Sequence, residues 1–246
     1  MNSQPFISII IPVYNGEKFL PGCLDALEST SYPQYELIVV DDCSTDRSVE
    51  ISSDRGARVL RMPRQSGPGA ARNLGAQEAR GDVLLFVDAD VVVKPDTIER
   101  VAADFVDHPE IAAVFGSYDD EPAEKNFISQ YKNLFHRFVH QQARSEAETF
   151  WAGCGAIRRD VFLAVNGFDA ERYPRPAIED IELGYRMRAQ GHRILLDKQL
   201  QAKHLKRWTL KSMLHADIFC RAVPWSILIF ESKGMVNDLN LQTTDR

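Results

Sequence analysis

The sequence lacks several features that mark particular protein classes. Its cysteines, Cys23, Cys43, Cys154 and Cys220, lie far apart without a C-x-x-C pair, so neither a zinc site nor a disulfide framework is predicted. No apolar run approaches the roughly 20 residues that span a bilayer, and the first residues lack the basic region of a signal peptide. Positive charge is not in surplus: 29 Lys and Arg stand against 35 Asp and Glu, a net charge of −6. Nucleic acid is therefore not an expected partner. The scattered cysteines fit a reducing cytosol, so a cytoplasmic protein is expected.

The residues that are present predict one large α/β domain. Of 246 residues, 44% are hydrophobic and 26% are charged, which is ordinary for a globular protein. In the first half, predicted strands alternate with predicted helices. The strands are expected at 6–13, 35–40, 59–62 and 83–87, and the helices at 17–29, after Ser44, up to Arg80 and at 95–106. This order predicts an α/β fold with a mainly parallel central sheet flanked by helices.

The second half of the sequence is less regular. Strands are expected at 111–118 and 193–196, and helices at 121–142, 178–190 and 209–222. The small residues of 150–157, Gly153 among them, would let backbone approach a ligand. A stripe of aromatic residues in the 121–142 helix is interpreted as core packing in preference to an acceptor platform: Phe127, Tyr131, Phe135 and Phe138.

The strongest local signal for chemistry is the end of the buried strand at 83–87, where Asp88-Ala89-Asp90 follows. Carboxylates are costly to bury unless they are paired or hold a cation. Residues i and i+2 of an extended segment point the same way, so both side chains would face one ion. The alternative is that Asp90 caps a turn while Asp88 is solvated. Asn15 and Asp42 follow the first two strands, and in a parallel sheet these ends share one edge, where ligands bind.

Further polar groups extend this candidate site. Arg72 follows the glycine-rich segment 66–69 and would place a positive charge near a diphosphate. Glu179 and Asp180 suit the start of a helix, and Asp180 beside its buried face would serve as a general base. His204 is either a surface histidine or a ligand that shares a cation with Asp90. Mixed carboxylate and imidazole ligation would suit Mn²⁺ or Mg²⁺.

Six motifs occur in a fixed order between Phe6 and about Trp208: IIIPVYNG, VVDDCSTD, ARNLG, FVDAD, AGCGAIRRDVF and IEDIELGYRMRAQGHRI. Together they resemble the family 2 inverting glycosyltransferases of GT-A fold. The resemblance implies a catalytic domain over 1–208, with a nucleotide-binding half at about 1–110 and an acceptor half at about 111–208. It implies metal-dependent transfer of a sugar from a nucleoside-diphosphate sugar, a UDP-sugar being favoured, to the hydroxyl of a glycan or lipid-linked acceptor in cell-surface glycan or glycolipid synthesis.

The same resemblance assigns roles to individual residues. Donor-binding residues would be Asp42 at the base, Pro12, Tyr14 and Asn15 around it, Arg72 and Asn73 at the phosphates or sugar, and Asp88 at the ribose or sugar. Gly153 and Glu179 would also contact substrate. Asp90, with His204, would ligate Mn²⁺ or Mg²⁺. Asp180 would be the catalytic base.

The C-terminal segment and the function class each have alternative interpretations. Residues 209–246 read as an amphipathic, partly basic helical extension, which would either lie on the inner face of the cell membrane or pack across the catalytic domain. For function, the alternatives are a nucleotidyltransferase and a non-catalytic sugar-nucleotide-binding protein. The first is disfavoured because residues 12–20 lack a glycine-rich basic loop.

Overall fold

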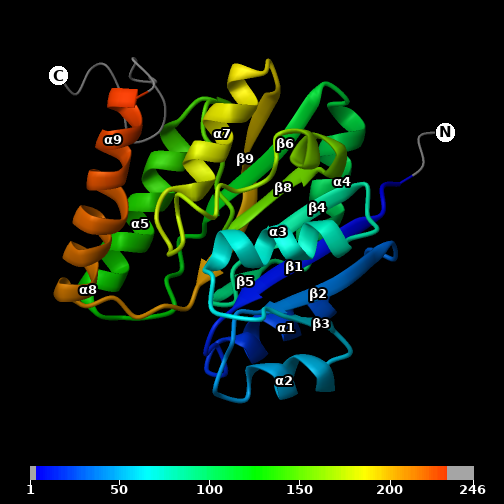
Figure 1. Ribbon diagram of the computed structural model, residues 1–246, viewed down its shortest axis with the longest axis horizontal. Helices are drawn as coiled ribbons and strands as arrows, with labels where there is room; N and C mark the ends of the chain where they lie inside the picture. Colours follow the sequence, from blue (N-terminus) through cyan, green and yellow to red (C-terminus); the bar gives the residue numbers. More distant parts are fainter. Residues whose placement is uncertain (1–3, 232–246) are drawn as a thin grey trace.

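The computed structural model describes residues 4–231 as a single twisted sheet with helices packed on it (Figure 1). The strands are β1 (Ile7–Val13), β2 (Tyr35–Asp41), β3 (Arg58–Arg61), β4 (Val83–Val87), β5 (Val91–Val93), β6 (Ile111–Tyr118), β7 (Glu146–Ala147), β8 (Cys154–Arg158) and β9 (Arg193–His204). The helices are α1 (Leu20–Glu28), α2 (Ser48–Asp54), α3 (Pro68–Glu78), α4 (Thr97–Asp107), α5 (Phe127–Gln142), α6 (Arg159–Ala164), α7 (Glu179–Ala189), α8 (Leu210–His215), the π-helical η1 (Ala216–Ala222) and α9 (Val223–Glu231).

The sheet confirms the predicted α/β class. Its strands follow the order β3-β2-β1-β4-β8-β6-β9-β5, and β7 pairs with β9. The first four strands are parallel, so the carboxyl ends of β1, β2 and β4 meet at one edge. In the second half, β8 runs antiparallel to both β4 and β6, whereas β9 runs parallel to β6.

Two hydrophobic cores cover the two faces of this sheet. Ile9 and Ile11 of β1 belong to the core that includes residues of α1 and α4. Ile10, between them, belongs to the core that includes residues of α3, α6 and α7. Successive side chains of a strand point to opposite faces, so a strand covered on both sides is apolar throughout. This is why the central strands were readable as continuous apolar runs.

Strand β9 is much longer than the predicted 193–196. It continues to His204, and its second half pairs antiparallel with β5, opposing Val91 to His204. Leu200, Ala202 and His204 are buried while the residues between them are not. Such alternation is typical of a half-buried strand. The β5–β9 pairing places His204 beside Asp90, whose carbonyl accepts a hydrogen bond from Leu205 N at 2.8 Å.

The predicted helix at 209–222 continues to Glu231, so α8, η1 and α9 form one helical stretch. It is the one helix within residues 4–231 that is long and apolar enough to cross a membrane, judged by length and composition alone. Pro224 has no N–H to donate to a preceding carbonyl, and the helix widens into π-type turns just before it. The part of the predicted extension beyond 231 lies outside the described residues.

The interpretation of the α5 aromatic stripe as core packing is wrong. Phe127, Tyr131, Phe135 and Phe138 are all exposed, and the buried residues of α5 are instead Ser129, Asn133 and His140. The helix therefore turns its polar and histidine side toward the sheet and its aromatic side outward.

Candidate active site

A cavity of about 1110 Å³ lies at the carboxyl ends of β1 and β4 and extends to the start of α7 and to α8 and η1. Ten of the twelve predicted site residues line it: Pro12, Tyr14, Asn15, Arg72, Asp88, Asp90, Gly153, Glu179, Asp180 and His204. They come from segments that are up to 192 residues apart in the chain. The parallel strand ends and the β5–β9 pairing bring them together.

Arg72 of α3 is buried between two carboxylates. Its Nη2 donates to Asp88 Oδ1 at 2.6 Å, and its Nη1 donates to Glu179 Oε1 at 3.3 Å. Burial opposes the charge of the guanidinium, but Asp88 and Glu179 hold the pKa of Arg72 above its usual value. Burial raises the pKa of Asp88, while Arg72 opposes that rise. One cation thus joins α3, the end of β4 and the start of α7.

Asp90 and His204 face each other across the β5–β9 pairing. His204 Nε2 lies 3.3 Å from Asp90 Oδ2, and His204 Nδ1 lies 3.1 Å from Asn133 Oδ1. The Asn133 amide donates to Ser129 O, so its oxygen is left to accept from Nδ1–H. Nε2 is therefore the nitrogen that faces Asp90: a protonated Nε2–H donates to Asp90 Oδ2, whereas the neutral Nδ1–H tautomer presents a lone pair to a cation. Burial opposes ionisation of Asp90, yet the hydrogen bond and charge of His204 lower its pKa.

Asp180 opens α7, where its carboxylate accepts hydrogen bonds from two backbone N–H groups. Ala152 N donates to Oδ2 at 3.2 Å, and Ile181 N donates to Oδ1 at 2.9 Å. Burial and the neighbouring Glu179 raise the pKa of Asp180 to about 6. The carboxylate is therefore fixed in orientation and more basic than an ordinary aspartate, as a general base near neutral pH requires.

Because Gly153 has no side chain, the indole of Trp151 can pack directly against it in the cavity wall. A Cβ at this position would lie 2.5 Å from the Trp151 ring, so any larger residue would displace it. The carbonyl of Gly153 accepts a hydrogen bond from Asp88 N at 3.2 Å. The small residues expected to admit a ligand thus also fix the position of the Asp88 backbone.

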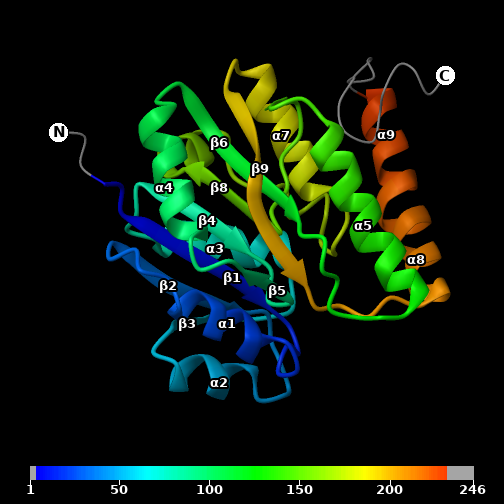
Figure 2. The same ribbon diagram turned by 180° about the vertical axis from the view of Figure 1, so that it is seen from behind.

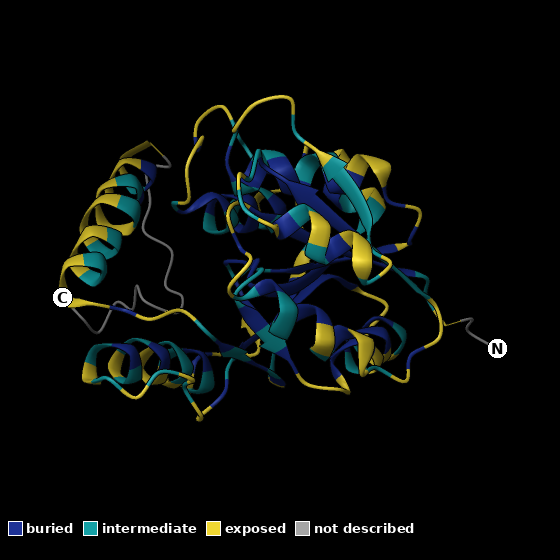
Figure 3. Ribbon diagram, turned by 90° about the horizontal axis from the view of Figure 1, so that it is seen from below, coloured by how far each residue is buried: buried dark blue, intermediate teal, exposed yellow. Residues whose placement is uncertain are grey.

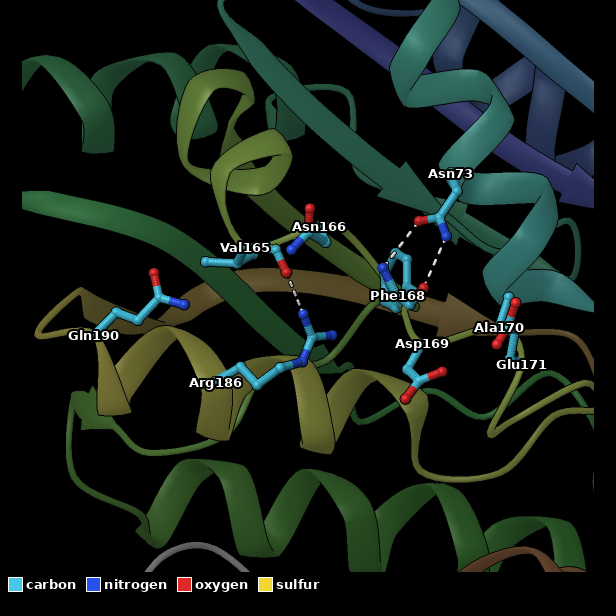
Figure 4. A pocket seen from close by; sticks show the side chains of 9 residues that line it. All are labelled: Asn73, Val165, Asn166, Phe168, Asp169, Ala170, Glu171, Arg186 and Gln190. Atoms are coloured by element: carbon cyan, nitrogen blue, oxygen red, sulfur yellow. Dashed lines mark hydrogen bonds between the residues drawn. The ribbon is translucent and has the colours of Figure 1, made fainter.

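Two predicted residues do not line the cavity, and their side chains instead hydrogen-bond the backbone of neighbouring loops. The Asp42 carboxylate accepts from Ser66 N at 2.7 Å and from Gly67 N at 2.8 Å, which fixes the loop before α3. Asn73 holds Phe168, donating to its carbonyl at 2.8 Å and accepting from its N–H at 2.9 Å. Figure 4 shows Asn73 in a separate pocket beside α7 that also contains Arg186. Their contacts with donor stay predictions.

A cluster of rings in the same cavity was not predicted from the sequence. Tyr118 lies parallel to the ring of His204, with centroids 4.8 Å apart, and 4.3 Å from the ring of His136. Burial holds the pKa of His136 well below its usual value and lowers that of His140 to about 4, so both rings are neutral at pH 7. The signal available in the sequence was the spacing of His136 and His140, one helical turn apart, on the opposite side of α5 from the aromatic stripe.

With this geometry in place, comparison with known proteins identifies the family. The model of Glycosyl transferase family 2 matches residues 8–165. The chain belongs to this family. A glycosyltransferase from Haemophilus influenzae is 42% identical over 104 residues, which are 40% of this chain and 41% of that protein. The nucleotidyltransferase and non-catalytic alternatives find no support in these matches.

Solved structures confirm the GT-A fold for this family 2 glycosyltransferase. The mannosyltransferase PcManGT from Pyrobaculum calidifontis, in complex with GDP-Man and Mn²⁺, aligns with a TM-score of 0.66 at 19% identity, covering 83% of this chain and 58% of its own. TarS from S. aureus, in complex with UDP-GlcNAc, aligns with a TM-score of 0.65 at 22% identity, covering 84% and 60%. The chain thus spans about two fifths of the H. influenzae relative and about three fifths of these structures.

Replacing Arg72 tests its place at the centre of the site. Arg72→Met leaves Asp88 and Glu179 without their cation, and we expect a loss of about 3 kcal/mol in the free energy of unfolding at pH 7.5. Burial raises the pKa of Asp88, and a protonated Asp88 needs no counter-charge, so the loss should shrink as the pH is lowered toward 5. Urea denaturation at both pH values measures this. Arg80→Met is the control: its side chain is 73% exposed and pairs with Glu36, so it should cost less than about 1 kcal/mol. Equal losses in the two variants would contradict the assignment.

Proposed function

We propose that this glycosyltransferase moves a sugar from a nucleoside-diphosphate sugar to an acceptor hydroxyl with inversion at the anomeric carbon. The observation that carries the proposal is the position of Asp180, a carboxylate with a raised pKa, in the same cavity as Asp88, Asp90 and His204. The similar structures hold UDP-GlcNAc or GDP-Man, which supports a nucleoside-diphosphate sugar as donor, and we take a UDP-sugar as the first candidate.

The donor would bind at the edge formed by β1, β2 and β4. Pro12, Tyr14 and Asn15 line that end of the cavity and would flank the base. Asn15 Oδ1 accepts a hydrogen bond from Thr45 N at 2.8 Å, so the two loops that enclose this end are tied together. Asp42 would act at the base through the loop that it holds, and Asn73 at the phosphates or sugar through the Phe168 backbone that it holds. Arg72 and Asp88 would meet the diphosphate and the ribose or sugar.

The pair Asp90 and His204 fits a divalent cation. Their facing oxygen and nitrogen are 3.3 Å apart, and two neighbouring ligands of an octahedral ion at about 2.1 Å lie about 3 Å apart. No three His, Cys, Asp or Glu side chains gather as a metal site within residues 4–231, so diphosphate oxygens and water would complete the shell. Bound there, Mn²⁺ or Mg²⁺ would stabilise the negative charge that gathers on the departing diphosphate.

The protein's own part in the reaction is orientation and proton transfer. The acceptor hydroxyl attacks the anomeric carbon from the side opposite the leaving diphosphate, and the bond between that carbon and the phosphate oxygen breaks. The hydroxyl proton passes to the Asp180 carboxylate, which two backbone N–H groups hold in place. General-base assistance of this kind contributes roughly 10²–10⁴ in rate.

We place the reaction in the cytoplasm at the inner face of the cell membrane, with a glycan or lipid-linked acceptor of cell-surface glycan or glycolipid synthesis. The acceptor class is supported by the similarity to TarS of Staphylococcus aureus, a poly(ribitol-phosphate) beta-N-acetylglucosaminyltransferase. The membrane location is supported by the apolar helical stretch Leu210–Glu231. This acceptor class also accounts for a cavity that extends past Asp180 to α8 and η1.

Substitution of the proposed base separates binding from transfer. Asp180→Asn keeps the shape and one of the two hydrogen-bond acceptors but not the basicity, so we expect donor binding within about twofold of wild type and a fall of at least about 100-fold in donor turnover. Calorimetry with the donor and release of nucleoside diphosphate measure the two quantities.

Asp160→Asn is a matched control for that variant. Asp160 also lies in the first turn of a helix, α6, and its carboxylate accepts from the next N–H, but it is exposed and outside the cavity. It should retain wild-type turnover. Near-normal turnover by Asp180→Asn, or an equal loss in both variants, would refute the role of Asp180 as base.

The raised pKa of Asp180 predicts the pH profile of transfer. The carboxylate must be ionised to accept a proton, so the rate should rise tenfold per pH unit below about 6 and level off above it. Measuring kcat/KM between pH 4.5 and 8 at saturating Mn²⁺ tests whether the rate falls below pH 6 as predicted. A rate that stays level down to pH 4.5 would contradict a base with this pKa.

A further inference from the structure

Helix α5 presents an aromatic stripe to solvent. Its rings recur every three or four residues, and Phe127 and Phe138 are 78% and 60% exposed. The rings of Phe127, Tyr131 and Phe135 stack on one another, with centroids 6.5 and 5.7 Å apart. The opposite side of α5 is held by buried Ser129, Asn133 and His140, so the helix cannot turn the stripe inward. A stripe of this size on a soluble surface marks an interaction site.

The helical stretch from α8 to α9 also has an apolar outer side. Its exposed apolar residues recur at helical spacing: Leu210, Leu214, Ile218, Phe219, Val223, Ile227 and Phe230. Its other side lines the cavity with Lys211, His215 and Arg221 among others. The stretch is held by the bond from Trp225 Nε1 to Tyr185 Oη at 3.2 Å and by the ion pair of Asp217 with Lys132 of α5. In Figure 3 most of it is coloured as exposed or intermediate.

The two helices lie at the same end of the molecule, away from strands β2 and β3 (Figures 1 and 2). Their exposed apolar residues are called the two-helix surface below. The two segments that form it are richer in positive charge than the rest of the chain. Residues 125–144 contain four Lys or Arg and no Asp or Glu, and residues 206–231 contain four Lys or Arg and two Asp or Glu. These segments carry +6 while the whole chain carries −6, so the remainder carries −12.

We propose that the two-helix surface docks on an anionic lipid bilayer. Exposed Phe and Leu would enter the headgroup boundary, while the exposed cations that flank the helices, Lys125, Arg144 and Arg207, meet anionic headgroups. A second copy of this chain fits less well, because a twofold contact would bring net-basic segments of the two copies together. The acidic remainder of the chain is repelled by the same bilayer, which fixes the orientation.

The stretch Leu210–Glu231 lies along the bilayer and does not cross it. His215, Asp217 and Arg221 fall near its middle, where a spanning helix would carry ionisable groups at the costliest depth. Asp217 is also paired with Lys132, a contact that insertion would break. Because the inner side of the same stretch lines the cavity, docking brings the acceptor end of the cavity to the bilayer. We therefore expect the acceptor to be lipid-linked, and this expectation rests on the proposed function.

Flotation of the full chain with vesicles tests the docking. We expect binding to phosphatidylcholine vesicles that contain 30% phosphatidylglycerol, and at least about tenfold weaker binding without the anionic lipid or in about 0.5 M salt. Phe127→Ser and Phe230→Ser, one from each helix, should each weaken binding about tenfold. Leu163→Ser, an exposed apolar residue of α6, should not. Circular dichroism confirms that the variants fold.

The other outcomes overturn the proposal. No vesicle binding, or equal binding by all the variants, would exclude docking through this surface. Protein that stays in the membrane after alkaline carbonate would show a spanning helix. A dimer in sedimentation that Phe127→Ser dissociates would assign the surface to a second copy. Asp180→Asn should bind vesicles like wild type, so a failure of docking and a failure of the proposed chemistry are distinguishable.

Discussion

The structure depends on one buried cation. The Arg72 guanidinium binds Asp88 at the end of β4 and Glu179 at the start of α7, and so ties the first half of the chain to the second. Without it, two carboxylates in a largely buried site would stand uncompensated, at a cost that exceeds what most single contacts supply. The same contact sets the positions of Asp90 and Asp180, each one or two residues from a partner of Arg72. Stability and the candidate chemistry therefore share one interaction.

Much of this arrangement was predictable from the sequence, because burial on both faces makes a strand apolar throughout. Once β1, β2 and β4 were recognised as parallel, their polar ends had to meet. The contributions of Asp42 and Asn73 were not predictable, since their hydrogen bonds to Ser66, Gly67 and Phe168 depend on loop conformation. The proximity of His204 to Asp90 depends on the register of β5 against β9, which local pattern does not determine.

Helix α5 shows a different limit of sequence reasoning. Its periodicity predicts two sides, one with Phe127, Tyr131 and Phe138 and one with Ser129 and His140, but hydrophobicity alone assigned the wrong one to the core. The inner side is polar because it supports a site: Asn133 holds His204 and His136 lines the cavity. The exposed aromatic side of α5 is understandable if another apolar surface covers it. The positive charge of the two helical segments favours a lipid bilayer as that surface.

The central claim is that Asp88, Asp90 and His204 hold a metal-bound nucleoside diphosphate. Thermal unfolding with UDP, GDP, dTDP or CMP, each with and without Mn²⁺, tests it most directly, with Asp90→Ala as the comparison. A ligand at about 100 times its Kd stabilises the folded chain by roughly 2.7 kcal/mol, or about 5–10 °C at this size. The account predicts such a shift for one nucleoside diphosphate, dependent on Mn²⁺ and lost in Asp90→Ala. A shift that is independent of Mn²⁺ and unchanged by Asp90→Ala, or no shift with any of the four, would contradict it.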